Sequence, residues 1–148
     1  MLLFGVICIL NKIKMKKYLL VGVACIFSNS IFAKKYYKCF VCDTKPNLQI
    51  SVCFENERVV YVKYKGQDET IPITFLKTKF ENGSAVYNDS YVEKYRGTVN
   101  GTYVITHTGN WDYVSYTRKK DGKKFEFTIN HETSVNERDN SYRTTPCF

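Results

Sequence analysis

The chain has 148 residues, of which 44% are hydrophobic and 24% charged, and its formal net charge is +8. This length is enough for one domain with its own core, and the lack of internal repeats or low-complexity segments argues against fibrous and solenoid architectures. The basic excess is mild in the main part of the chain, because residues 34–148 keep 18 basic and 14 acidic side chains, hence +4. It permits an anionic partner without requiring one.

Residues 1–33 have the pattern of a secretory signal peptide. Four lysines and no acidic residue precede or border an apolar run, Tyr18–Phe27, and a short segment of small and polar residues follows it. We predict cleavage after Ala33, which leaves a single domain over residues 34–148 in the periplasm or outside the cell. Met15 is a better start of such a signal than Met1.

A lipid anchor is the less favoured alternative to a cleaved signal. Cys25 follows Gly22-Val23-Ala24, which weakly matches a lipoprotein signal. A transmembrane span is less favoured still, because about 20 apolar residues are needed to cross a bilayer.

Export leaves four cysteines, and an even number in an oxidising compartment predicts a disulfide framework. Cys39 and Cys42 are too far apart on one strand to bond to each other. A first hairpin centred near Pro46 would place Cys39 opposite Cys53 and leave Cys42 for Cys147. We therefore predict the disulfides Cys39–Cys53 and Cys42–Cys147. A redox-active pair or a zinc site formed by these cysteines is less favoured, because neither the surrounding βαβ pattern nor suitable ligand spacing is present.

Short apolar segments at regular spacing predict an all-β chain with about eight strands. Asn100-Gly101 is the strongest hairpin signal, and Lys119–Gly122 predicts a second tight turn, so that four antiparallel strands run from Tyr91 to Ile129. We expect a small antiparallel barrel, closed or nearly closed and stapled by two disulfides, rather than a sandwich. The earlier strands are expected near residues 36–43, 48–54, 59–64, 70–75, 76–80 and 85–87.

The turn at Lys119–Gly122 also predicts a register. It places Val114 opposite Phe127 on an apolar inner face and leaves Trp111 and Tyr113 on the polar face. Two large aromatic residues on a solvent face are typical of a contact surface. A covering loop, or a register slip of one residue, would bury them instead.

Residues suited to catalysis are scarce. His107 and His131 are the only histidines, and the predicted first hairpin places His107 opposite Lys94, which favours a structural role. Paired carboxylates, a serine elbow and a phosphate-binding glycine loop are not apparent in the sequence. We predict a protein that is not an enzyme and uses no metal or cofactor. Nucleic-acid binding by aromatic and lysine residues is less favoured in an exported protein.

Several segments resemble the bacterial periplasmic inhibitors of c-type lysozyme, which are small disulfide-bonded β-barrels. They are Tyr37-Lys38-Cys39, Leu48–Cys53, Val60–Gly66, Ile71-Pro72-Ile73, Asn82–Tyr87 and Lys94–Gly97. The resemblance implies that Ser84 and Arg96 occupy the places of the serine and lysine that this family directs toward the catalytic carboxylates of lysozyme. Residues 109–125 resemble uncharacterised exported proteins of Gram-negative bacteria, which implies no function.

The favoured hypothesis is an exported binding protein of the bacterial envelope that inhibits a lysozyme-type hydrolase. Its partner-binding residues would be Ser84, Arg96, Trp111 and Tyr113. One alternative is a barrel that carries a small ligand among interior aromatic residues. Another is a surface domain that binds anionic glycans or lipid headgroups through Lys119, Lys120, Lys123 and Lys124.

Overall fold

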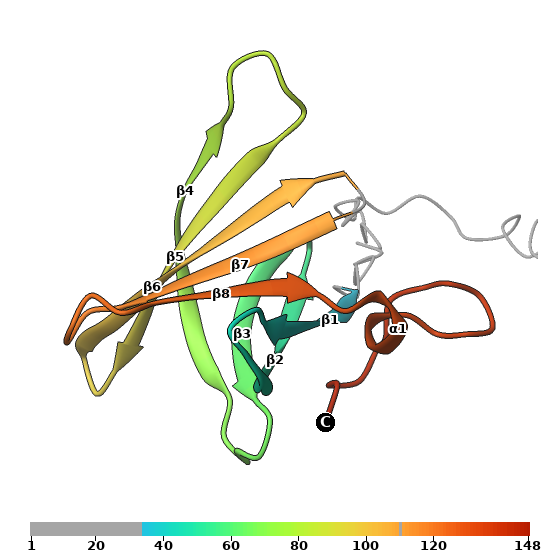
Figure 1. Ribbon diagram of the computed structural model, residues 1–148, viewed down its shortest axis with the longest axis horizontal. Helices are drawn as coiled ribbons and strands as arrows, with labels where there is room; N and C mark the ends of the chain where they lie inside the picture. Colours follow the sequence, from blue (N-terminus) through green and yellow to red (C-terminus); the bar gives the residue numbers. More distant parts are fainter. Residues whose placement is uncertain (1–33, 110) are drawn as a thin grey trace, which may run out of the picture. The chain divides into compact units, whose positions relative to one another are not determined.

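A computed structural model describes residues 34–109 and 111–148 (Figure 1). The predicted signal peptide, its cleavage site, Met15 and Cys25 lie outside the described residues. Eight strands and one short helix follow in chain order: β1 (Lys35–Cys42), β2 (Lys45–Glu55), β3 (Arg58–Tyr64), β4 (Ile71–Phe80), β5 (Tyr87–Tyr95), β6 (Thr98–Thr108), β7 (Trp111–Arg118), β8 (Lys124–Ile129) and α1 (His131–Ser134).

The eight strands form a closed antiparallel barrel, which confirms the predicted fold class. Each strand pairs with its neighbour in the sequence, and β1 closes the ring by pairing Phe40, Val41 and Cys42 with the end of β8. Closure removes the unpaired strand edges that an open sheet would expose. Among the described residues, no helix has the length and apolar character needed to cross a membrane.

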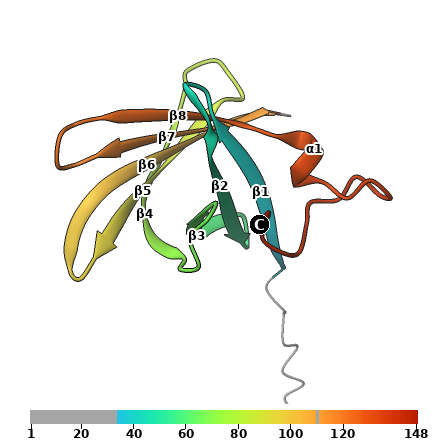
Figure 2. The ribbon, with the colours of Figure 1, turned by 60° about the horizontal axis from the view of Figure 1, so that its bottom comes forward.

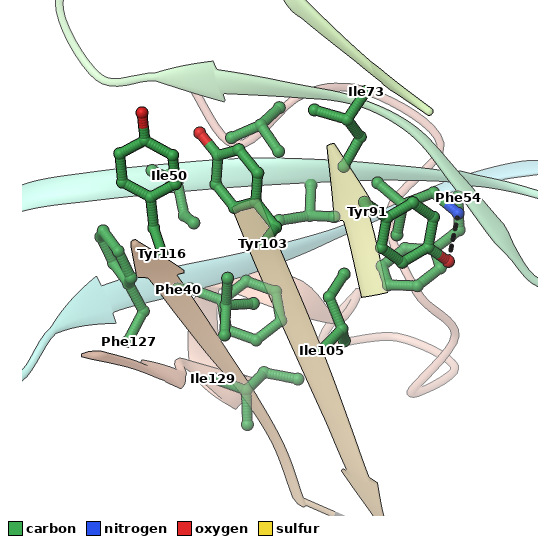
Figure 3. Close-up of a cluster of buried hydrophobic side chains, with 14 of the residues drawn as sticks. Phe40, Ile50, Phe54, Ile73, Tyr91, Tyr103, Ile105, Tyr116, Phe127 and Ile129 are labelled. Atoms are coloured by element: carbon green, nitrogen blue, oxygen red, sulfur yellow. Dashed lines mark hydrogen bonds between the residues drawn. The ribbon is translucent and has the colours of Figure 1, made fainter. Parts of the chain in front are cut away.

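Alternation along the strands fills the middle of the barrel with side chains (Figure 3). The core includes Phe40, Ile50, Phe54, Ile105 and Phe127, each at most 1% exposed. A ligand in the middle of the barrel would have to displace these side chains. The ligand-carrying hypothesis is therefore confined to the two ends.

The hairpin at Lys119–Gly122 has the predicted register, with Val114 paired to Phe127. Arg118 N donates to Lys123 O over 2.9 Å, and Gly122 adopts φ +67°. Trp111 and Tyr113 accordingly lie on the outer face, as this register predicted.

The prediction for the preceding hairpin was wrong. Its turn lies at Arg96-Gly97, because both residues have positive φ (50° and 79°) and Tyr95 pairs with Thr98. β5 therefore begins at Tyr87 rather than Tyr91. The segments predicted at 70–75 and 76–80 form one continuous strand, β4, with an irregularity between Phe75 and Lys77.

Gly101 lies inside β6 and serves a purpose other than turning the chain. A Cβ at this position would lie 2.3 Å from Tyr116 Cε2 and 2.5 Å from its hydroxyl oxygen. The missing side chain lets the Tyr116 ring cross β6 and stack on Tyr103, with the ring centroids 4.5 Å apart. Close packing, rather than φ, therefore explains this glycine.

The predicted disulfides Cys39–Cys53 and Cys42–Cys147 are also wrong, because the described chain forms one disulfide, Cys39–Cys147. β2 begins at Lys45, before Pro46, so Cys39 pairs with Ser51 and Tyr37 pairs with Cys53. Cys42 follows the inward set of β1 and is buried in the core, away from the outer side on which Cys147 lies. Cys42 and Cys53 remain buried free thiols.

After α1 the chain loops away from the barrel, and its last residues return beside β1 (Figure 2). Tyr37 N donates to Arg143 O over 2.9 Å, and Cys147 N donates to Ser51 Oγ over 3.2 Å. Ser134 Oγ accepts from Cys39 N over 2.8 Å, which attaches α1 to the same strand. The tail therefore covers backbone and side chains that would otherwise face water.

Candidate functional site

The outer face of β7 carries two exposed aromatic residues, Trp111 and Tyr113. Trp111 is 49% exposed and Tyr113 42% exposed, whereas Asp112 between them is buried. Thr106 on β6 and Thr128 on β8 both pair with Tyr113, and Val41 on β1 pairs with Thr128. Short side chains on the neighbouring strands therefore flank the two aromatic rings on the outer surface of the barrel. We call the surface formed by Val41, Thr106, Trp111, Tyr113 and Thr128 the aromatic face.

A hollow of about 570 Å³ borders the aromatic face beside Trp111. The His131 ring forms one wall and meets the Trp111 ring edge-on, with the centroids 4.8 Å apart. α1 holds His131 there, because the side chain of Asn130 caps the helix by accepting from Thr133 N over 3.2 Å. The contact of His131 with Trp111 could not be predicted from the spacing of these residues in the sequence.

Two acidic side chains line this hollow. Asp43 and Glu132 both line it and are both exposed, and Asp43 Oδ1 accepts from Thr128 Oγ1 over 2.9 Å. The aromatic face is therefore bordered by negative charge, although the whole domain is mildly basic. Such a rim would favour a partner with a basic surface.

Ser84 and Arg96, the other two predicted partner-binding residues, do not lie together. Ser84 is exposed in the loop between β4 and β5, where its Oγ accepts from Val86 N over 3.1 Å. Arg96 is in the turn at the other end of β5, with its guanidinium 5.1 Å from the centroid of the Tyr95 ring. A nine-residue strand separates the two ends by about 30 Å.

Trp111 lies at the same end of the barrel as Ser84. Tyr87 at the start of β5 pairs with His107, and His107 pairs with Asp112 next to Trp111. Of the four predicted residues, Trp111 and Tyr113 form one surface, Ser84 belongs to the same end, and Arg96 belongs to the opposite end.

A buried ionic cluster occupies the interior at the Ser84 end. Asp112, 3% exposed, accepts from Lys38 Nζ and from His107 Nδ1, the latter over 2.8 Å. The other ring nitrogen, His107 Nε2, lies 4.0 Å from Asp89 Oδ2. Asp89 in turn accepts from Thr78 Oγ1 over 2.5 Å and from Arg58 Nη1 over 3.3 Å. His107 thus faces carboxylates, and its predicted position opposite Lys94 was wrong.

Burial would raise the pKa of Asp112, but the hydrogen bond from His107 and the charge and hydrogen bond of Lys38 outweigh it and lower the pKa. The carboxylate is therefore held in its charged form. Lys38 also lies 4.7 Å from the centroid of the Tyr142 ring and 5.0 Å from that of Phe54. The Asp112 carboxylate and the Lys38 ammonium group are therefore both compensated by partners inside the protein.

The cluster offers little access to a substrate. The His107 side chain is 12% exposed, and the Tyr87 ring stacks on it with the centroids 4.5 Å apart. Within residues 34–109 and 111–148, no three His, Cys, Asp or Glu side chains are grouped to hold a metal ion. The cluster is best explained as a structural network of ion pairs and hydrogen bonds that connects β1, β5, β6 and β7.

Sequence reasoning missed this cluster, although one signal for it was present. The predicted register already placed Asp112 on the inner face with Val114, and a carboxylate at an inward position needs a buried donor. The donor itself could not be identified from the sequence, because Lys38 is 74 residues away from Asp112. Its position on the inner face of β1 depends on the register of that strand.

The four lysines considered for anionic glycans or lipids gather at the β7–β8 hairpin. All four are exposed: Lys119, Lys120, Lys123 and Lys124. Lys124 pairs with Glu126, and the nearby Arg118 pairs with Asp121. The local positive charge is therefore partly neutralised.

Comparison with known proteins adds no relative: no family model, no curated protein and no solved structure matches this chain.

Proposed function

We propose that this chain is an exported, non-enzymatic binding protein of the bacterial envelope that recognises a basic protein partner, of the lysozyme-type hydrolase class, through its aromatic face. The observation that carries the proposal is the exposure of Trp111 and Tyr113 side by side on a rigid wall. Tryptophan and tyrosine are enriched among the residues that dominate binding energy. Because a strand holds both residues, little conformational entropy is lost on binding.

The acidic border supports the choice of partner. Asp43 and Glu132 beside Trp111 would complement a basic surface, and the sequence resemblance to lysozyme inhibitors suggests a partner of that kind. Ser84 lies at the same end and can contribute at the edge of the interface. Arg96 is placed outside this interface.

Export is supported by the charge and apolar pattern of residues 1–33 and by the Cys39–Cys147 disulfide, since such bonds persist mainly outside the cytoplasm.

The test measures inhibition of c-type lysozyme and binding to it by the purified protein and by three variants. Trp111→Ala and Tyr113→Ala are each expected to weaken binding at least about tenfold. Tyr95→Ala is the matched control, because Tyr95 is 54% exposed but lies at the Arg96 end. Absence of inhibition at micromolar protein, or equal losses in all three variants, would refute the proposal.

A further inference from the structure

The end of the barrel opposite the ionic cluster contains a different kind of site. We call it the mouth; it is the end at which β3, β5 and β7 finish and β4, β6 and β8 begin. A hollow of about 400 Å³ opens there, within the usual range for small-ligand sites. It is lined by Leu48, Tyr64, Gln67, Ile71, Glu93, Tyr116, Arg118 and Phe125.

Glu93 is the distinctive residue of the mouth. It is 6% exposed, and its carboxylate accepts from Asn100 Nδ2 and from the Tyr103 hydroxyl, each over 3.2 Å. Both donors are neutral, and no lysine, arginine or histidine in the described part of the chain forms an ion pair with it. A buried carboxylate without a cation is costly, so the mouth has an unmet need for positive charge.

The walls around Glu93 are aromatic and rich in hydroxyl groups. Tyr103 and Tyr116 stack and direct their hydroxyl groups to the same side (Figure 3). The Tyr64 hydroxyl lies 3.0 Å from that of Tyr103, and Phe125 continues the stack beyond Tyr116 with the centroids 6.3 Å apart. Aromatic faces beside a carboxylate are the groups that recognise ammonium ions.

Two basic residues beside the mouth, Arg118 and Lys123, are already engaged. Arg118 donates to both carboxylate oxygens of Asp121, over 2.9 Å and 2.6 Å. Lys123 Nζ and the Arg118 guanidinium lie 5.4 Å and 5.8 Å from the centroid of the Phe125 ring. A ligand would therefore share the Phe125 ring with these two side chains, neither of which pairs with Glu93.

An adjoining hollow of about 800 Å³ shares Glu93 and widens the approach. Its other charged residues balance, with Asp68 and Glu69 against Lys94 and Arg96. The deeply placed Glu93 therefore determines the sign of the charge that the mouth prefers.

We propose that the mouth binds a small organic ammonium compound, with the cationic group at Glu93 and its alkyl substituents against Tyr116 and Phe125. This site is independent of the aromatic face, which lies on the outer wall. A neutral molecule of the same shape would leave the carboxylate uncompensated and bind more weakly.

The test compares choline with its neutral isostere 3,3-dimethyl-1-butanol by calorimetric titration of the purified protein. Choline is expected to bind at least about tenfold more tightly than the isostere. Glu93→Gln should remove this preference, whereas Glu126→Gln, an exposed change on β8, should keep it. Phe125→Leu preserves apolar bulk and should weaken the binding of choline but not that of the isostere. This second variant keeps the test decisive if Glu93→Gln fails to fold.

Equal binding of the two compounds, no binding of choline, or choline binding unchanged in Glu93→Gln or Phe125→Leu would overturn the proposal. Sedimentation with phosphatidylcholine vesicles distinguishes the source of the ligand. Co-sedimentation that Glu93→Gln abolishes would assign the ammonium group to a lipid headgroup. Binding of free choline without co-sedimentation would assign it to a soluble compound.

Discussion

The pairing of Lys38 with Asp112 inside the barrel gives the sharpest test of the fold. Asp112→Asn would leave the Lys38 ammonium buried, at 8% exposure, without its carboxylate. Removing one partner of a buried ion pair typically costs about 3–5 kcal/mol. At an m value of about 1.5 kcal/mol/M, the urea midpoint should fall by about 2 M or more. Urea unfolding followed by far-UV circular dichroism measures this shift.

Lys38→Met should cost less than Asp112→Asn, because His107 remains to donate to the carboxylate. The double variant should recover part of the loss, with a coupling of about 0.5–3 kcal/mol. Glu126→Gln is the control, because its pair with Lys124 is exposed and exposed pairs contribute little. A midpoint shift in Asp112→Asn no larger than that of the control, or strict additivity in the double variant, would refute the reasoning.

Four further predictions follow from the fold. The pKa of Asp112 is lowered in the folded state. Its contribution to stability is therefore present above the unfolded pKa of about 4 and is lost as the pH falls through the folded pKa. Asp112→Asn should make the stability of the protein less dependent on pH in the acid range. Gly101→Ala should destabilise the barrel by about 1–3 kcal/mol in urea unfolding, because the new methyl group overlaps the Tyr116 ring; an unchanged midpoint would contradict this. Cys147→Ser should cost about 2–5 kcal/mol, since the lost disulfide closes a loop with a sequence separation of 108, and an unchanged urea midpoint would exclude this role. Alkylation of the exported, non-reduced protein, read by mass spectrometry, should label two thiols after denaturation and none before it; four labels would contradict the disulfide.

The sequence was sufficient to predict the architecture, because that prediction depends on local signals that agree with one another. Lys119–Gly122 has the residues of a tight turn, and the alternation on both sides of it places Val114 against Phe127. Regular spacing of short strands then favours a closed barrel. The exposure of Trp111 followed from the same alternation.

The errors arose where two local signals competed and distant packing decided between them. Asn100-Gly101 and Arg96-Gly97 can both form a turn, but Gly101 is needed under Tyr116, and Asn100 donates to Glu93. A shift of two residues at the first hairpin likewise changed the partner of Cys39 from Cys53 to Ser51. Neither choice is encoded within a short window of sequence.

The mouth could not be predicted for the same reason. Glu93 reads as one of many charged residues in an alternating strand, and its burial depends on the corrected turn of β5 and β6. Tyr64 and Tyr103, whose hydroxyl groups meet beside it, are 39 residues apart. Only the closed ring of strands brings them together.

The attachment of Cys147 to Cys39 determines how the barrel would respond to mechanical load. A pulling force applied between the start of β1 and Phe148 would pass from Cys39 to Cys147 through the disulfide, so residues 40–146 would not lie on the covalent load path. The seam at which β1 meets β8, three residue pairs that all lie inside this loop, would then be shielded from the load. A cargo fused after Phe148 would therefore be held beside the outer side of β1 by the disulfide rather than by the strands.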